Sequence, residues 1–179
     1  MSIFITTVNE LTTDEAKSLG AQSSAIKEAG CHDLIIKKCY ETTTDNWSSM
    51  TVEFETPLGE TIHYSGFFGT PKDSSAEAVD KANQQTKRTM ADISRIVKAA
   101  GIPSVKEAAG GAVAEVDDKG RKVTVFTKLA NKKLVGTTYT LIDGQKKDGQ
   151  IIADKVFVKQ ELDTLKFLTK DGKDGMGRD

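Results

Sequence analysis

The residue types that most often carry out chemistry are few in this chain of 179 residues, and their spacing is unfavourable. Cys31 and His32 are adjacent, but neighbours in an extended strand point to opposite faces, which argues against a nucleophile paired with its base. Cys31 and Cys39 would lie roughly 26 Å apart in one strand, too far for a disulfide. A zinc site would have to use residues that lack close paired spacing, namely Cys31, His32, Cys39 and His63.

Other catalytic patterns are also weak. Asp117 and Asp118 precede Lys119-Gly120, a combination typical of a turn. The sequence contains no phosphate-binding glycine loop of the P-loop type. An enzyme, for example a small hydrolase, would need a convergent catalytic cluster that the sequence does not indicate. We therefore expect a protein that is not an enzyme and that uses no metal and no cofactor.

Aromatic rings in polar or basic surroundings are more informative. Trp47 lies in a polar segment, where recognition residues are common, although it could instead fold back over the end of a sheet. Phe157 stands between Lys155 and Lys159 on one face of an expected strand. That pattern suits a base and its phosphates, while an exposed strand edge kept soluble by lysine is the alternative.

Further aromatic residues and lysines extend this set. Tyr64 and Tyr139 lie in expected strands and could equally belong to the core. Binding of a single strand needs aromatic faces for the bases and a basic groove for the phosphates. The candidate binding residues are Lys38, Tyr40, Trp47, Tyr64, Phe67, Lys132, Lys133, Tyr139, Lys146, Lys147, Lys155, Phe157 and Lys159.

Charge is distributed unevenly along the chain. The formal net charge is −1, which alone argues against a nucleic-acid-binding protein. It divides into −6 for residues 1–60, 0 for residues 61–120 and +5 for residues 121–179. The last third is therefore a basic segment, which predicts a local positive surface near one end of the fold.

Hydrophobic periodicity predicts the elements that would position these side chains. Alternation predicts strands over residues 30–40, 50–55, 61–67, 134–142 and 151–159. Apolar residues at three- and four-residue steps predict a helix from Ser75 to Ala100, with Ser74 and Glu77 as a capping box. A capping box at Thr12 and Glu15 predicts a short helix near the N-terminus. Residues 122–129 fit either a strand or a helical turn.

This order predicts a mainly β, α+β fold: a five-stranded OB-fold barrel with the helix between strands 3 and 4. In that fold the loops at 41–49 and 143–150 would flank the binding face. The expected domains are an N-terminal arm (1–29), the OB-fold domain (30–160) and a flexible C-terminal tail (161–179). No apolar run approaches the roughly 20 residues of a membrane span, and two cysteines indicate a reducing, intracellular setting.

Several motifs follow one another over about residues 28–160: Glu28-Ala29-Gly30, the strand from His32 to Lys38, the Thr-rich turn, the strand from Met50 to Glu55, and Leu134-Val135-Gly136 before a later strand. On these residues the chain resembles a family of bacteriophage single-stranded DNA-binding proteins. The resemblance implies an OB-fold and non-sequence-specific binding of single-stranded DNA during phage replication or recombination, in the cytoplasm of the infected host.

The resemblance has one departure. Proteins of this kind commonly finish in a strongly acidic tail that recruits replication partners, whereas the sequence from Lys170 to Asp179 has mixed charge. Recruitment of phage replication proteins through such a tail is therefore in doubt. The rival expectation is an OB-fold module for a protein partner, a replisome or virion adaptor that binds no DNA.

Overall fold

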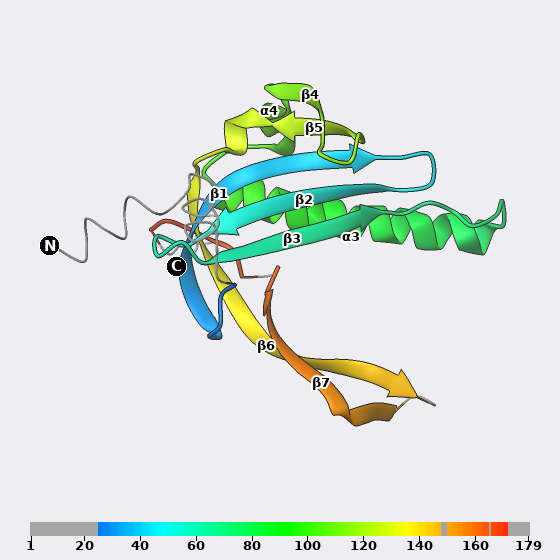
Figure 1. The fold of residues 1–179 in the computed structure, drawn as a ribbon. Coiled ribbons are helices and arrows are strands. Elements are labelled where there is room, and N and C mark those ends of the chain that lie inside the picture. Colours follow the sequence, from blue (N-terminus) through cyan, green and yellow to red (C-terminus); the bar gives the residue numbers. More distant parts are fainter. Residues whose placement is uncertain (1–24, 148–149, 165, 172–179) are drawn as a thin grey trace, which may run out of the picture.

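The computed structural model describes residues 25–147, 150–164 and 166–171, which form antiparallel strands and one long helix (Figure 1). The strands are β1 (Gly30–Thr43), β2 (Ser48–Glu55), β3 (Thr61–Phe68), β4 (Ala112–Val116), β5 (Lys122–Phe126), β6 (Lys133–Lys147), β7 (Gln150–Leu162) and β8 (Leu168–Thr169). The helical elements are α3 (Ala76–Ala99), α4 (Val105–Ala109) and the 3₁₀ turn η1 (Thr127–Leu129). The predicted mainly β class with one long helix, placed after the third strand, is confirmed.

Strand β1 is the central strand of the sheet. One of its edges pairs with β2, and the other pairs with β6 along its first half and with β5 near its end. A β-bulge between Ile36 and Lys38 separates these halves, and Lys37 within it forms an ion pair of 2.8 Å with Glu55. Because the bulge adds one residue, Ile36 faces the core and Lys38 faces the opposite side, although they are two positions apart.

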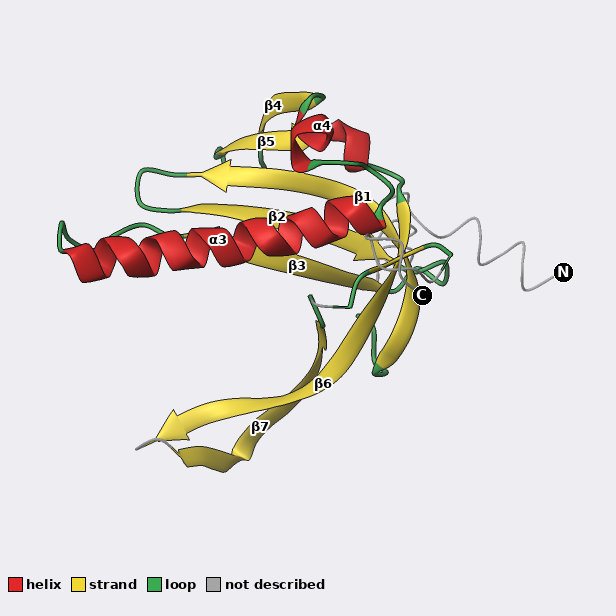
Figure 2. Ribbon diagram, turned by 180° about the vertical axis from the view of Figure 1, so that it is seen from behind, coloured by secondary structure: helices red, strands yellow, loops and turns green. Residues whose placement is uncertain are grey.

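Helix α3 covers one face of the β1–β2–β3 sheet (Figure 2). Its N-cap is Ser75, whose hydroxyl accepts a hydrogen bond from the Ala78 amide. The predicted capping box was therefore displaced by one residue: Ser74 is not the cap, and Glu77 instead forms an ion pair of 2.6 Å with Lys81. The helix buries Ile93, Ile96 and Val97 against the sheet, among other residues.

The core lies between α3, the covered face of the sheet and the C-terminal segment. Phe54 is completely buried and stacks on Phe167, with ring centroids 5.9 Å apart. Gly69 lets α3 pack close to the end of β3, because a Cβ at this position would collide with the backbone of Ala82 in the helix.

The folded unit extends beyond the predicted central domain on both sides. The folded unit includes Ala25 and Ile26 upstream of the expected start, since Ile26 is buried and its amide donates to the Thr61 carbonyl. The expected flexible tail is partly ordered, because Leu162 and Phe167 are buried and β8 pairs with β6. The predicted N-terminal capping box lies within residues 1–24, which, like residues 172–179, are outside the described residues.

The predicted five-stranded barrel is not what the described residues form. They contain eight strands, and no pairing joins β3 to β7, so the sheet does not close. The undecided segment at 122–129 consists of β5 and η1, and β4 precedes it as an additional strand. Both expected loops are shorter than predicted, because β1 reaches Thr43 and β6 reaches Lys147. The β6–β7 hairpin projects from the sheet (Figures 1 and 2), and from here on 'the arm' means this hairpin and not the N-terminal residues.

No helix within the described ranges is long and apolar enough to cross a membrane.

We predict that Phe54→Ala lowers the free energy of unfolding by about 3–5 kcal/mol, because it removes a fully buried ring and its stacking contact with Phe167. Chemical denaturation followed by circular dichroism measures this. The control is Leu58→Ala in the β2–β3 turn, where the side chain is 88% exposed and the expected change is within about 0.5 kcal/mol. Equal effects of the two substitutions would contradict the assigned core.

Candidate nucleic-acid interface

We call the face of the β1–β2–β3 sheet opposite α3 the open face, because none of the helices in the described ranges lies over it (Figure 1). Strand register assigns its residues, because directly paired residues of antiparallel strands share a face. Tyr40, Thr51 and Ser65 are paired in this way on the open face. The next row faces the core and contains Val52 and Tyr64. The open face is therefore the surface on which exposed candidate residues can meet a ligand.

Three side chains from separate elements meet at one end of the open face, and we call them the Trp47 cluster. The rings of Trp47 and Phe67 pack edge to face, with centroids 5.9 Å apart. The guanidinium carbon of Arg121 lies 6.0 Å from the centroid of the Trp47 ring. Phe67 remains 53% exposed and Trp47 is half-buried. The cluster therefore offers an aromatic surface with a cation beside it.

A short loop fixes the position of Trp47. Thr44 accepts a hydrogen bond from the Trp47 amide at 3.1 Å, and its own amide donates to the Trp47 carbonyl at 2.9 Å. The Thr44 hydroxyl also bonds to that carbonyl at 3.0 Å. The expected nine-residue loop is thus a tight connection between β1 and β2. Trp47 packs partly against Phe67 and is half-buried. It is therefore neither a fully exposed recognition residue nor a ring completely folded back over the end of the sheet, the two alternatives that the sequence left open.

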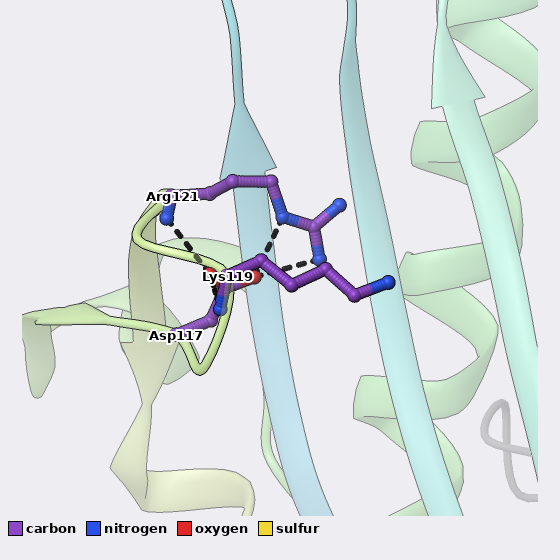
Figure 3. Close-up of polar contacts among 3 residues, drawn as sticks. All are labelled: Asp117, Lys119 and Arg121. Atoms are coloured by element: carbon purple, nitrogen blue, oxygen red, sulfur yellow. Dashed lines mark hydrogen bonds and ion pairs between the residues drawn. The ribbon is translucent and has the colours of Figure 1, made fainter.

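The turn between β4 and β5 positions Arg121 (Figure 3). Asp117 accepts hydrogen bonds from the amides of Lys119 and Arg121 and from the Arg121 guanidinium, whose Nε lies 2.6 Å from Oδ2. Gly120 has a positive φ of 74°, as three-residue hairpin loops require. The Arg121 amide, above all, lowers the pKa of the Asp117 carboxyl. Asp117 therefore stays ionised near neutral pH and holds Arg121 in place.

Lys119 adds a second cation at this turn. Its side chain extends in the same direction as that of Arg121, over the β1–β2 end of the sheet (Figure 3). Sequence reasoning missed both residues, although the Asp-Asp-Lys-Gly turn was identified. Both cations lie at this end of the open face because β5 pairs with the end of β1, and this pairing brings the turn beside Trp47.

The middle of the open face carries mixed charge. Lys38 lies 5.6 Å from the centroid of the Tyr40 ring and 3.2 Å from the Glu115 carboxylate of β4. Burial and the neighbouring Glu53 carboxylate raise the pKa of Tyr40, so its phenol remains neutral. The structure thus brings two of the candidate residues, Lys38 and Tyr40, together, and it places acidic residues beside them.

A cleft of about 440 Å³ separates β3 from β7 at the other end of the open face, and we call it the β3–β7 cleft. It lies where β3 and β7 face each other without pairing. Its lining residues come from both sides of this gap and are Ile62, His63, Tyr64, Ser65, Tyr139, Lys159, Gln160, Glu161, Leu162 and Thr164. Two predicted residues, Tyr139 and Lys159, therefore lie together in the cleft.

The structure removes Tyr64 from the set of stacking candidates. Its side chain faces α3 and is only 7% exposed, and its hydroxyl donates a hydrogen bond of 3.2 Å to Asp92. Burial is the main cause that raises its pKa far above the ordinary value. Tyr64 is therefore a core residue, which was the alternative that strand alternation could not exclude.

The predicted basic residues do not form one cluster. Lys132 and Lys133 are exposed at the start of β6, whereas Lys146 and Lys147 belong to its far end. Along an extended strand Lys133 and Lys146 are about 43 Å apart. Lys155 and Phe157 lie in β7 of the arm, and their side chains, like those of Lys146 and Lys147, are outside the described part. The basic last third is thus spread along the hairpin.

The two cysteine thiols and His32 are not part of the Trp47 cluster or the β3–β7 cleft, whereas His63 lines the cleft. Cys31 and Cys39 are both free thiols of β1, and burial raises the pKa of Cys39 to about 12. His32 bonds to the Glu28 carbonyl and the Thr138 hydroxyl. Within the described ranges, no group of three His, Cys, Asp or Glu residues could hold a metal ion.

Comparison with known proteins gives no assignment. No protein-family model matches the chain. No curated protein matches it at a significant level.

We predict that Asp117→Asn shifts the fluorescence of Trp47, the single tryptophan, at pH 7 toward that of a more exposed indole, because Arg121 loses its ionic anchor. The folded-state pKa of Asp117 is depressed, so its stabilising effect is present above its unfolded value of about 3.9 and is lost as pH falls through the folded value. Wild-type emission should therefore approach that of the variant only below about pH 4.

The matched control is Asp118→Asn, which removes the same charge from the exposed neighbouring residue and should leave the emission unchanged. Identical spectra for Asp117→Asn and the wild type at pH 7 would contradict the anchoring role.

Proposed function

We propose that this protein is a non-sequence-specific single-stranded DNA-binding protein, which holds the strand on the open face of its sheet and performs no chemistry on it. The observation that carries the proposal is the Trp47 cluster: an exposed Phe67 ring and a fixed Trp47 ring beside Arg121. Bases stack on aromatic faces whatever their identity, and a cation beside the rings suits the linking phosphates. The cluster combines both requirements on one exposed surface.

The path proposed for the strand follows β3. Phe67, Ser65 and His63 alternate along the open face of β3 and lead from the Trp47 cluster to the β3–β7 cleft. Tyr139, which is 43% exposed, offers a second aromatic face at that end. Because the net charge is −1, the phosphates must be bound by local cations rather than by the overall field of the protein.

We propose further that the fold is a modified, open OB-fold. Support comes from the three-strand meander followed by a helix, and from β1, which pairs with both β2 and β6. The β1–β2 loop and the β6–β7 hairpin would then flank the binding face, as they do in OB-folds. The β4–β5 hairpin and the open gap between β3 and β7 are the departures.

The biological setting follows only from the resemblance to phage single-stranded DNA-binding proteins. We propose a role in phage DNA replication or recombination, in the cytoplasm of an infected host. Phage replication proteins are the expected partners.

One observation favours the second candidate function, a module for a protein partner. Ile142 and Val158 are directly paired across the β6–β7 hairpin, and they are 63% and 62% exposed. An exposed apolar pair on a projecting arm is typical of protein contacts. This surface is separate from the Trp47 cluster, and a protein that uses only the arm would bind no oligonucleotide.

We predict that Phe67→Ala and Trp47→Ala each weaken binding of a labelled oligo-dT by about 5- to 150-fold, the range expected for loss of one base–aromatic stack. Fluorescence anisotropy at fixed salt measures the change. Leu58→Ala, which removes an exposed apolar side chain from the far turn, serves as the control and should bind as the wild type does. Wild-type binding by both aromatic variants, or no binding by the wild type, would contradict the proposal.

We predict that Arg121→Ala and Lys119→Ala each reduce the salt dependence of binding, lowering the slope of log K against log salt by about 1 through the loss of one phosphate contact. Lys81→Ala is the matched control, because this lysine is paired with Glu77 on α3, away from the open face. Unchanged slopes in both turn variants would contradict phosphate contacts by Arg121 and Lys119.

A further inference from the structure

The β3–β7 cleft has the size and chemistry of a small-molecule site. Its volume of about 440 Å³ lies within the usual range for ligand pockets, roughly 300–1,000 Å³. Tyr64 and Leu162 line it and belong to the core, so the cleft ends against a rigid apolar surface. His63, Ser65 and Gln160 add polar groups around it. A cleft with an apolar floor and polar groups around it suits a flat heterocycle with hydrogen-bonding edges.

A carboxylate held in a defined position distinguishes this cleft from the Trp47 cluster. Glu161 is paired with Tyr139 across the hairpin, and its Oε2 accepts a hydrogen bond of 3.0 Å from the Tyr139 hydroxyl. Its Oε1 lies 2.7 Å from Nζ of Lys159. The hydrogen bond to Glu161 is the main cause that raises the pKa of Tyr139, so the phenol keeps its proton and continues to donate.

The presence of Glu161 decides which part of a nucleotide this cleft would accept. A carboxylate only accepts hydrogen bonds and repels phosphate oxygens, but it binds N–H groups strongly. In an unpaired strand the Watson–Crick edges are exposed, and cytosine presents an exocyclic amine there, whereas thymine presents a carbonyl oxygen. Glutamate and aspartate accept from the cytosine amine in protein–DNA complexes generally.

We propose that the β3–β7 cleft binds one unpaired nucleobase that carries an exocyclic amino group, with its ring against Tyr139 and its amine donating to Glu161. The proposal rests on the proposed single-stranded DNA binding and deepens it. It adds a modest base preference at one position of the bound strand, while the Trp47 cluster remains indifferent to base identity. Tyr139 then serves both as the stacking surface and as the group that orients Glu161.

Oligo-dC and oligo-dT of equal length test this preference, because both are pyrimidine strands and differ at the group that Glu161 would contact. We expect the wild type to bind oligo-dC about tenfold more tightly than oligo-dT, as one hydrogen bond to a charged group allows. Competition anisotropy at pH 8 and fixed salt measures the ratio of the two dissociation constants.

Two variants separate the base contact from general binding. In Glu161→Gln the side chain both donates and accepts, so the ratio should fall to about 1 while oligo-dT affinity stays within about twofold. Tyr139→Phe keeps the ring but loses the bond to Glu161, so the ratio should fall while stacking is retained. Glu115→Gln, a carboxylate on β4 outside the cleft, is the matched control and should keep the wild-type ratio.

The outcomes distinguish this proposal from the one on which it rests. Equal binding of the two oligonucleotides by the wild type, or an unchanged ratio in both cleft variants, would overturn the base site and leave single-stranded DNA binding intact. Failure of the folded wild type to bind either oligonucleotide would overturn both. Circular dichroism of each variant verifies folding, and Tyr139→Phe provides the test if Glu161→Gln does not fold.

Discussion

The bulge in β1 is the constraint on which the rest of the structure depends. One extra residue at Lys37 reverses the alternation of the strand, so Leu34 and Ile36 enter the core while Lys38 and Tyr40 face outward. A regular strand would keep all four even-numbered residues on one face. It would then have to bury a lysine or expose two aliphatic side chains. The bulge therefore allows one strand to build the core with β6 and the open face with β2 and β5.

The same strand connects the parts of the candidate site. The end of β1 pairs with β5, and this pairing brings the Asp117–Arg121 turn to Trp47, which follows β1 in the chain. A residue at each end of the contact is anchored by its own loop, Arg121 by Asp117 and Trp47 by Thr44. Such local anchoring reduces the conformational entropy lost on binding. The rings and the cation are therefore arranged before a ligand arrives.

Much of the framework was predictable from the sequence, because alternation in Met50–Glu55 and helical spacing from Val79 to Val97 are local signals. The pairing of distant segments was not. Nothing local indicates that β5 lies beside β1, so Arg121 could not be connected with Trp47. Nor could charge counts show that Lys133 and Lys146 occupy opposite ends of a long strand. Tyr64 was ambiguous for a related reason, since alternation defines two faces of a strand but not which of them α3 covers.

Under the proposed function, the acidic residues beside the open face would restrict where a polyanion can lie on a protein with almost no net charge. Glu115 and Glu161 are each paired with a lysine, and Glu161 also accepts from Tyr139. Carboxylates held in this way repel phosphates only locally, and they exclude the backbone of a strand from some positions while accepting base amines at others. A uniformly basic groove would bind any polyanion in any register. Under the proposed function, alternating cations, rings and carboxylates would suit a single strand of nucleic acid, in which phosphates and bases also alternate.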